Sequence, residues 1–558
     1  MSLPRKAAAD SEAAASASAS ASASAAAAGT VTLPGARRAL RHPATAPAVI
    51  ALIALGISLY GIGTPALWYD EAATVVAATR SWPELWATVA NIDAVHALYY
   101  ALMHVWFDLV GYTPTTLRLP SAVAVAFAAA LTVVFTRQLS ALAGGVAGSA
   151  RAHHVVGFIA GLTFCVLPRV TWLGTEGRSY ALTTAFAALL TVLLLTAIRS
   201  GRHRWWVIYV AVGVVACVVF LYLALLVVAH AVGVVLWFLL ERRPVLGETR
   251  TAEPRPEFIP IGPHIDRRLL TRALVAALAV GLVLLPFAML VISEQGQVAW
   301  LLPLDGATIG SVLRTQWFYN SVEFAVAGWA LIVWGAITLI HQRTGRGRAA
   351  ILLPALLLPT LALLLATLTL TPLYTPRYLV MSLPFVAAVM AFGIVGLANR
   401  RVMVLVLAAL IVLAVPPIQT QRMPAAKENT AWQRVAALIA TQRAADPAGS
   451  RTAIIYGTIR FHPSATARVI AYSYPSAFTD TLDVTLKTPA NLTGRLWERS
   501  YPLKKTLDRL ATESVTYLVT STTDDRVPQT TQQLATAGWT PSGSWRVADV
   551  TVVRYIRS

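Results

Sequence analysis

The sequence contains a series of apolar stretches between residues 47 and 417, most of them long enough to cross a lipid bilayer as a helix. One crossing takes about 20 predominantly apolar residues. Only 13% of the 558 residues are charged and 56% are hydrophobic, whereas a soluble domain usually carries about 25% charged residues. We therefore predict an all-α polytopic membrane protein. The composition excludes a secreted disulfide scaffold, a mostly disordered chain and an ordinary cytosolic enzyme.

We expect about eleven membrane-spanning helices, with thirteen crossings as the competing count. The eleven segments are residues 47–63, 116–136, 154–168, 180–198, 205–221, 223–240, 273–293, 324–341, 350–371, 377–398 and 402–417. The apolar stretch 97–110 is counted separately, because its 14 residues are few for a span and more typical of an interfacial helix.

Clusters of arginine lie in alternate connectors between the apolar segments. Because Lys and Arg concentrate in cytoplasmic loops, these clusters predict the orientation of the chain. They are Arg137/Arg151, Arg199/Arg202/Arg204, Arg242/Arg243/Arg267/Arg268, Arg343/Arg346/Arg348 and Arg400/Arg401. The other connectors and the tail after residue 418 are then expected on the outer side. The formal net charge of +19 is explained by this topology and does not indicate nucleic-acid binding.

The two ends of the chain differ from the apolar region between them. Residues 1–45 are Ala/Ser repeats with scattered charge, which cannot form a core, so we predict a disordered cytoplasmic tail. The transmembrane domain is expected over 46–417, and its first apolar run reads as a retained signal anchor. Residues 418–558 have an ordinary composition and predict a small α/β extracytoplasmic domain. Its expected helix covers 431–443, and its expected strands cover 452–456, 468–472, 515–520 and 547–556.

Acidic residues concentrate in the first outward connector, residues 64–115. It holds five acidic residues and one cation, Arg80, which gives a net charge of −4 within a chain of +19. Asp70 and Glu71 stand side by side there, directly after the first span. Successive residues on a helix diverge by about 100°, so only one of the two faces a given cavity, and the other is expected to orient it. The alternative is that the pair merely caps the next helix, where the helix dipole favours acids.

Three further groups of residues are candidates for binding a substrate. The first is His96 with Tyr99 and Tyr100, for which an interfacial histidine and an aromatic belt are the alternatives. The second is Glu176, Arg178 and Tyr180, in which Glu176 and Arg178 alternatively form a local ion pair. The third is Arg377 with Tyr378. An outward arginine at the start of a span is unusual and suits an anionic partner such as a phosphate, although snorkelling to lipid phosphate is the alternative.

These motifs, taken in order, resemble the membrane glycosyltransferases of the GT-C superfamily over roughly residues 47–400. The resemblance is carried by Asp70-Glu71-Ala72, His96-x-Leu98-Tyr99-Tyr100, Arg118-Leu119-Pro120-Ser121, Glu176-x-Arg178-x-Tyr180 and Arg377-Tyr378. The chain is similar to the branch related to protein O-mannosyltransferases, lipid A aminoarabinose transferases and bacterial lipopolysaccharide sugar transferases of the Rgt type. It departs from the family where His96-Ala97-Leu98 replaces His-Pro-Pro-Leu, and where Phe220-Leu221-Tyr222 replaces a common histidine.

The resemblance implies a bacterial enzyme that uses a polyprenyl-phosphate sugar, with mannose expected first and arabinose next. The acceptor would be an envelope glycan, lipid or protein on the outer face of the plasma membrane. Asp70 matches the family's catalytic carboxylate, and Glu71 would orient Asp70 or the acceptor. Arg377, and after it Arg178, would bind the phosphate. The remaining matched positions would contact substrate: His96, Tyr99, Glu176, Tyr180 and Tyr378.

Other readings of the same sequence stay open. The first is that Asp70 and Glu71 bind a divalent cation, because members of the superfamily differ in metal dependence. A transporter or flippase for a polyprenyl-linked sugar also needs many spans and outward cations. The absence of acidic residues well inside the expected spans argues against it, because proton relays usually require them. A third reading is a carbohydrate- or partner-binding C-terminal module on an inactive membrane core.

Overall fold

The structure is a computed structural model that describes residues 43–142, 150–241, 265–294, 296, 300–342, 345–462 and 464–558. Residues 46–558 form one compact unit. The predicted tail over 1–45 lies outside the described residues except for its last three. Arg242, Arg243 and Arg343 of the predicted cytoplasmic connectors lie outside them as well.

All eleven predicted spans are helical. Within the described residues, eight helices are long and apolar enough to cross a membrane. They are α7 (Pro114–Leu142), α10 (Tyr180–Ser200), α12 (Leu223–Glu241), α13 (Arg267–Ser293), α15 (Val322–His341), α16 (Arg346–Thr369), the run of η5 (Pro376–Ser382) and α17 (Leu383–Val395), and α18 (Arg400–Thr420). The other three have 15 to 17 residues: α3 (Thr45–Leu59), α8 (Ala150–Val166) and α11 (His203–Val219). The polytopic all-α architecture is confirmed, and a crossing by the three short helices stays a prediction.

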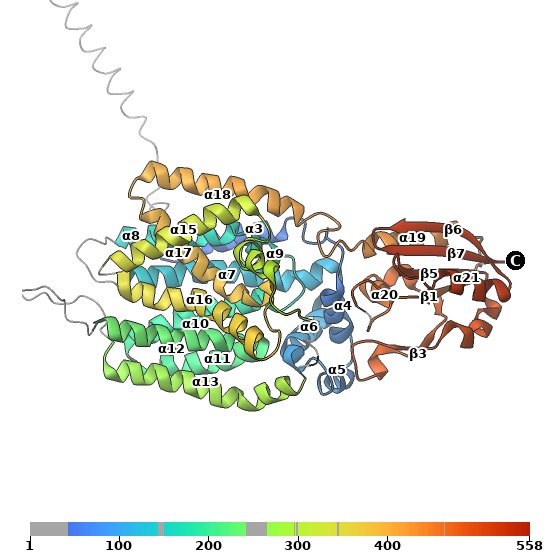
Figure 1. Cartoon of the computed structure of the whole chain (residues 1–558), viewed down its shortest axis with the longest axis horizontal. Helices are drawn as coiled ribbons and strands as arrows, with labels where there is room; N and C mark the ends of the chain where they lie inside the picture. Colours follow the sequence, from blue (N-terminus) through green and yellow to red (C-terminus); the bar gives the residue numbers. More distant parts are fainter. Residues whose placement is uncertain are drawn as a thin grey trace, which may run out of the picture. The chain divides into compact units, whose positions relative to one another are not determined.

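The helices of the bundle differ in how far their neighbours cover them. In its most apolar stretch the run ending in α17 is 89% buried, whereas α13 and α18 are only 17% buried. Figure 1 shows α13 and α18 at opposite edges of the bundle. They expose aliphatic side chains such as Leu278 and Leu405, which are stable against lipid and unfavourable in water.

Within the bundle, α15 and α17 approach each other closely because both carry glycine at the crossing. A Cβ atom at Gly393 would lie 2.6 Å from the carbonyl oxygen of Leu331, and one at Gly335 would overlap the carbonyl group of Val389. Only glycine permits this approach, which is a common way of packing helices where no water drives them together.

The connector between α3 and α7, which the arginine pattern predicts to face outward, folds into four short helices. They are α4 (Tyr69–Ala78), α5 (Trp82–Val89), η1 (Ala94–His96) and α6 (Ala97–Val110). α6 is the 14-residue helix expected for the stretch 97–110. At the start of α5, the Ser81 backbone N–H donates to the Glu84 carboxylate at 3.0 Å, as part of a capping box. The connector is therefore a structured platform.

The C-terminal part forms a small α/β domain, as predicted. Its five-stranded sheet has the order β2-β1-β5-β7-β6, in which β1 pairs in parallel with β2 and β5, and β7 pairs antiparallel with β5 and β6. The strands of this sheet are β1 (Thr452–Tyr456), β2 (Thr481–Asp483), β5 (Val515–Ser521), β6 (Trp539–Val547) and β7 (Val550–Arg557), with a separate hairpin of β3 (Leu486–Thr488) and β4 (Arg499–Ser500). The helices are α19 (Trp432–Ala445), α20 (Arg468–Ser473) and α21 (Val527–Thr536).

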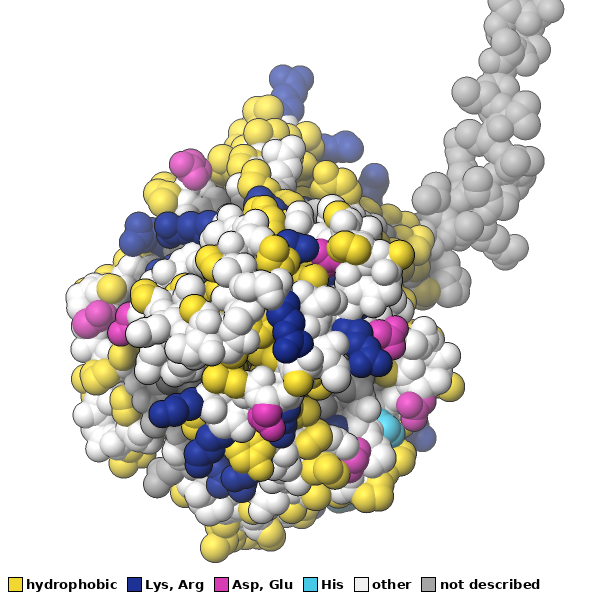
Figure 2. Space-filling view, turned by 90° about the vertical axis from the view of Figure 1, so that its right-hand side faces the viewer, with side chains coloured by type: hydrophobic (Ala, Val, Ile, Leu, Met, Phe, Trp, Pro, Cys, Tyr) yellow, Lys and Arg dark blue, Asp and Glu magenta, His cyan; other side chains and the backbone are white. Residues whose placement is uncertain are grey.

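One predicted strand is wrong. Residues 468–472 form the short helix α20, although Arg-Val-Ile-Ala-Tyr has the composition of a strand. Tertiary contacts override the local preference, because the helix buries Val469 and Ile470 in the core that the domain shares with α4 and α6. Figure 2 shows the face at the C-terminal end, where Lys/Arg and Asp/Glu side chains are scattered among uncharged and hydrophobic ones. Such a mixture is typical of a surface in water.

Candidate active site on the first outward segment

Asp70 and Glu71 lie in the first turn of α4 and point in different directions. The side chain of Glu71 is 0% exposed, and that of Asp70 is 17% exposed. This divergence follows from the rotation of about 100° per residue along a helix. Only Asp70 is therefore open to a substrate, and Glu71 belongs to the interior.

Glu71 is fixed by Arg118 of α7. The guanidinium makes a bidentate ion pair with the carboxylate, at 2.8 Å from Nε to Oε1 and 2.7 Å from Nη2 to Oε2. Its other N–H groups donate to the backbone carbonyls of Ile62, Pro65 and Ala66. All five donors of the buried guanidinium are thus satisfied, and the turn before α4 is held in place.

A lysine from beyond the last span completes this buried network. Lys427 Nζ donates to Glu71 Oε1 at 2.7 Å and to Glu176 Oε2 at 2.9 Å, and also to the carbonyl oxygen of Thr175. Glu176 lies between α9 (Pro168–Leu173) and α10, and its Oε1 accepts a hydrogen bond from Trp68 Nε1 at 2.8 Å. We call Glu71, Arg118, Glu176 and Lys427 the inner cluster.

The two carboxylates of the inner cluster have opposite pKa shifts. Burial alone would raise the pKa of Glu71, but the charges of Arg118 and Lys427 outweigh it and lower the pKa to about 2. Burial raises the pKa of Glu176 to about 7, because Lys427 offsets it only in part and the negative Glu71 adds to it. Glu71 is therefore ionised at neutral pH, whereas burial beside the negative Glu71 makes Glu176 hold its proton more tightly than an exposed glutamate does.

Asp70 faces a cation instead. Arg377, at the start of η5, lies 3.4 Å from Asp70 Oδ2 through its Nη1 atom, and its side chain is 18% exposed. The Arg377 guanidinium also lies over the rings of Trp68 and Trp300, at 5.2 and 4.9 Å from their centroids. These two aromatic faces hold the cation by cation–π attraction, while its edge stays accessible.

Arg178 supplies a second cation on the other side of α4. Its Nη1 atom donates to the backbone oxygen of Asp70 at 3.3 Å and to Tyr100 Oη at 3.2 Å, and its Nη2 atom lies 2.8 Å from His96 Nε2. Tyr100 in turn donates to Asp93 at 2.9 Å. We call Asp70, His96, Arg178 and Arg377 the outer group. The structure brings its members together from four separate segments.

Three polar atoms of the outer group lack partners. Arg178 Nε, Arg377 Nε and His96 Nδ1 are buried and have no hydrogen-bond partner among the described residues. Because the Arg178 guanidinium donates to His96 Nε2, the ring proton lies on Nδ1, so all three atoms are donors. Buried donors without partners are rare in folded proteins, and three of them within the outer group suit a ligand rich in acceptor oxygens.

The other predicted contact residues surround this group to different degrees. Tyr99 and Tyr180 are buried, and Tyr180 packs against Phe220 at 6.0 Å between ring centroids. Tyr378 is partly exposed and stacks near Tyr222 at 5.3 Å. Tyr378 is thus more accessible than Tyr99 and Tyr180.

The C-terminal domain clamps the residue that precedes Asp70. The ring of Tyr69 stacks on His462 with 3.6 Å between centroids and 5° between planes. Its hydroxyl oxygen accepts a hydrogen bond from Trp497 Nε1 at 2.7 Å and lies 3.4 Å from Ser464 Oγ. We call His462, Ser464 and Trp497 the Tyr69 clamp. The local sequence of the outward segment contains no signal for it.

The carboxylates of Asp70 and Glu71 do not point to a shared site for a metal ion. Both oxygens of Glu71 are taken by Arg118, Lys427 and the backbone N–H of Gly177, while Asp70 is paired with Arg377. Among the described residues, no group of three or more His, Cys, Asp or Glu side chains has the placement of metal ligands.

Solved structures of this architecture exist. The crystal structure of ArnT from Cupriavidus metallidurans bound to undecaprenyl phosphate has a TM-score of 0.51 and 12% sequence identity, and the match covers 91% of this chain and 97% of that chain. The crystal structure of the same protein in the apo state has a TM-score of 0.50 and 13% sequence identity, and the match again covers 91% of this chain and 97% of that chain. The chain has the fold of ArnT. The expectation from the sequence motifs is confirmed at the level of the fold. No family model and no curated protein matches the sequence.

Proposed function

We propose that the protein is a membrane glycosyltransferase that moves a sugar from a polyprenyl-phosphate donor to an envelope glycan, lipid or protein on the outer face of the plasma membrane. The observation that carries the proposal is the pairing of Asp70 with Arg377 at 3.4 Å, both partly exposed and surrounded by unpartnered donors. Mannose is the expected sugar and arabinose the next. The neighbour ArnT, crystallised with undecaprenyl phosphate, supports a lipid donor of this kind.

Asp70 acts as the general base in this proposal. It takes the proton from the acceptor hydroxyl while the oxygen attacks the anomeric carbon from the side opposite the phosphate. The bond from that carbon to the phosphate oxygen breaks, and polyprenyl phosphate leaves with the electron pair. The configuration of the sugar is inverted. A positioned base of this kind contributes about 10²–10⁴-fold to the rate.

Arg377 and Arg178 stabilise the leaving phosphate. Charge develops on the phosphate oxygens as the bond breaks, and fixed cations in a water-poor site stabilise that charge strongly. In the free protein Arg377 is paired with Asp70. A donor phosphate that binds Arg377 competes with this pair and releases the Asp70 carboxylate for the acceptor. Donor binding then prepares the base.

The remaining matched residues have positioning or contact roles. Glu71 holds the start of α4 through Arg118 and Lys427 and so orients Asp70. Glu176 supports the same framework from the inner cluster. His96, Tyr99, Tyr180 and Tyr378 provide the hydrogen-bonding and aromatic surroundings of the donor.

The test uses the purified full chain with radiolabelled polyprenyl-phosphate mannose, then with the arabinose donor, and an envelope extract as acceptor. Asp70→Asn keeps the size of the side chain and removes the base, so we expect sugar transfer to fall at least ~100-fold. Arg377→Ala should weaken use of the donor. Released polyprenyl phosphate and labelled acceptor are measured.

Asp108→Asn is the matched control, because Asp108 lies in the same outward segment with a side chain that is 67% exposed. It should transfer as the unmodified protein does. Near-normal transfer by Asp70→Asn would refute the assignment of the base. Movement of the lipid donor across vesicle membranes without cleavage would refute the enzyme and favour the transporter.

A further inference from the structure

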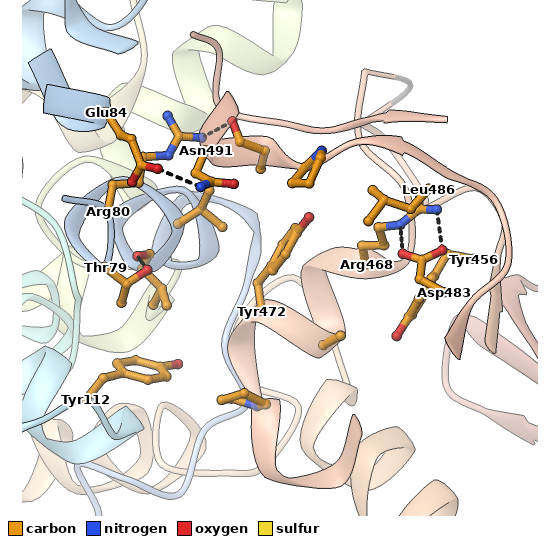
Figure 3. Close-up of a pocket in the computed structure, with 16 residues that line it drawn as sticks. Thr79, Arg80, Glu84, Tyr112, Tyr456, Arg468, Tyr472, Asp483, Leu486 and Asn491 are labelled. Carbon is orange, nitrogen blue, oxygen red and sulfur yellow. Dashed lines mark hydrogen bonds and ion pairs between the residues drawn. The ribbon is translucent and has the colours of Figure 1, made fainter. Parts of the chain in front are cut away.

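A cavity lies between the connector that carries α4 and α5 and the C-terminal domain. Its volume is about 540 Å³, and α4 and α5 line one side while α20 and the chain around β2 and β3 line the other. Figure 3 shows Tyr472 standing between the Arg80–Glu84–Asn491 group and the Arg468–Asp483 pair. This volume lies within the range of about 300–1,000 Å³ of small-ligand sites.

The cavity is separate from Asp70. Val75 and Val76 of α4 and Thr79, the residue directly after it, line the cavity, and they lie roughly 140–240° around the helix from Asp70 at about 100° per residue. Along the axis, Thr79 is about 14 Å beyond Asp70 at 1.5 Å per residue. The cavity therefore opens on the reverse face of the helix that carries the proposed base.

Its lining combines aromatic rings with paired charges. Tyr112, Tyr456 and Tyr472 contribute rings from three different segments. Arg468 is held by Asp483, at 2.7 Å from Nη2 to Oδ1.

The charges of the lining cancel. The two arginines, Arg80 and Arg468, face two carboxylates, Glu84 and Asp483, so the lining has no net charge. A neutral lining of rings and hydrogen-bonding groups does not suit a phosphate or another strongly anionic ligand.

One buried donor of the lining has no partner. The Arg80 side chain is only 4% exposed, and its terminal nitrogens are bound to Thr88 and to the carbonyl oxygens of Ala490, Arg495 and Leu496. Its Nε atom has no hydrogen-bond partner among the described residues. A buried guanidinium nitrogen without a partner is costly.

We propose that this cavity binds a sugar residue of the acceptor glycan, remote from the hydroxyl that reacts. The inference rests on the proposed function and specifies its acceptor as an oligosaccharide or polymer. The tyrosine rings pack against the apolar faces of a sugar ring, and the side chains of Glu84, Asp483 and Asn491 hydrogen-bond its hydroxyls. The distance from Asp70 requires an acceptor longer than one residue.

The first test measures binding and does not depend on transfer. Full-length Asp70→Asn protein in detergent is titrated calorimetrically with manno- and arabino-oligosaccharides, from monosaccharide to hexasaccharide. We expect affinity to rise with length. Adding Ala471→Trp, which fills the cavity from α20, should weaken hexasaccharide binding at least ~10-fold, the factor that corresponds to about 1.4 kcal/mol.

A second variant that fills the cavity from another side distinguishes loss of the cavity from misfolding of one variant. Thr79→Trp enters from the exposed rim of the cavity and should weaken binding to the same extent. Ala535→Trp, at an exposed site on α21, is the matched control and should bind as the parent does. The proposal is overturned when neither oligosaccharide series binds, or when both filling variants bind like the control. A failure of the proposed function shows separately, as normal transfer by Asp70→Asn.

Discussion

Two neighbouring carboxylates have different environments in this protein because a helix turns between them. Asp70 meets an accessible arginine, whereas Glu71 is buried with Arg118 and Lys427. The sequence predicts that only one of the pair faces a cavity. It does not indicate which partners bury the other, because Lys427 lies 356 residues away along the chain.

The titration of Glu176 predicts how stability depends on pH. Burial raises the pKa of Glu176 to about 7, above the value of about 4.3 expected in the unfolded chain. The folded protein then holds one more proton than the unfolded chain between these values, so its stability falls as the pH rises through about 7. Glu71, whose pKa is lowered to about 2, contributes stability that is lost only in acid.

We expect the unfolding temperature of the purified protein to decrease from roughly pH 5 to pH 8, and this decrease to be smaller in Glu176→Gln. Glutamine keeps a carbonyl acceptor for Trp68 or Lys427 but carries no proton to titrate. Glu84→Gln is the control, because hydrogen bonds from Asn491 and Ser81 lower the pKa of Glu84 and move its titration below this window. The prediction is wrong if the unfolding temperature of Glu176→Gln decreases with pH as steeply as that of the unmodified protein.

Among the elements, α4 is held from both sides. On one side, α7 contributes Arg118 and the connector between α9 and α10 contributes Arg178; on the other, the C-terminal domain contributes the Tyr69 clamp. The C-terminal domain therefore contacts the residue next to the proposed base, which favours a role in positioning that base.

Trp497→Phe tests this role of the clamp. The substitution removes the N–H that donates to Tyr69 Oη and keeps an aromatic ring. We expect the rate of transfer to fall ~10-fold with an unchanged KM for the lipid donor, because a base misplaced by 1 Å can cost about 100-fold. Trp545→Phe, on β6 of the same domain, should leave the rate as it is. Identical rates for both variants would argue that the clamp only supports folding.

Elements with a clear local pattern were predicted, and those fixed by distant contacts were not. The strand β1 and the helix α19 follow the expected ranges within two residues. The strand β6 has no expected counterpart over most of its length, because Pro541 and Gly543 interrupt the pattern of a strand. An edge strand with a register shift at that point accommodates both residues.

At the scale of the whole molecule, the arginine pattern predicts which side of the membrane each connector faces. The fold agrees with a polytopic chain, and the orientation is open to a direct test. The native cysteines should not react with a thiol-labelling reagent, because Cys165 and Cys217 are buried within the bundle.

Single cysteines introduced on the two sides should react differently. Lys505→Cys lies on the exposed surface of the C-terminal domain, and Arg202→Cys lies in the exposed connector between α10 and α11. On intact cells, a membrane-impermeant maleimide should label the first variant and reach the second only after permeabilisation. Labelling of the Arg202→Cys variant in intact cells would reverse the assigned orientation.

Lys427 has a consequence for how the chain is made. Glu71 is synthesised early. Lys427, which contacts both Glu71 and Glu176, comes 356 residues after Glu71. At about 5–20 residues per second, the outward platform waits roughly 20–70 s for this partner. A chain truncated before residue 427 would leave two buried carboxylates facing Arg118 alone. The platform is therefore completed only in chains that extend past the bundle to Lys427.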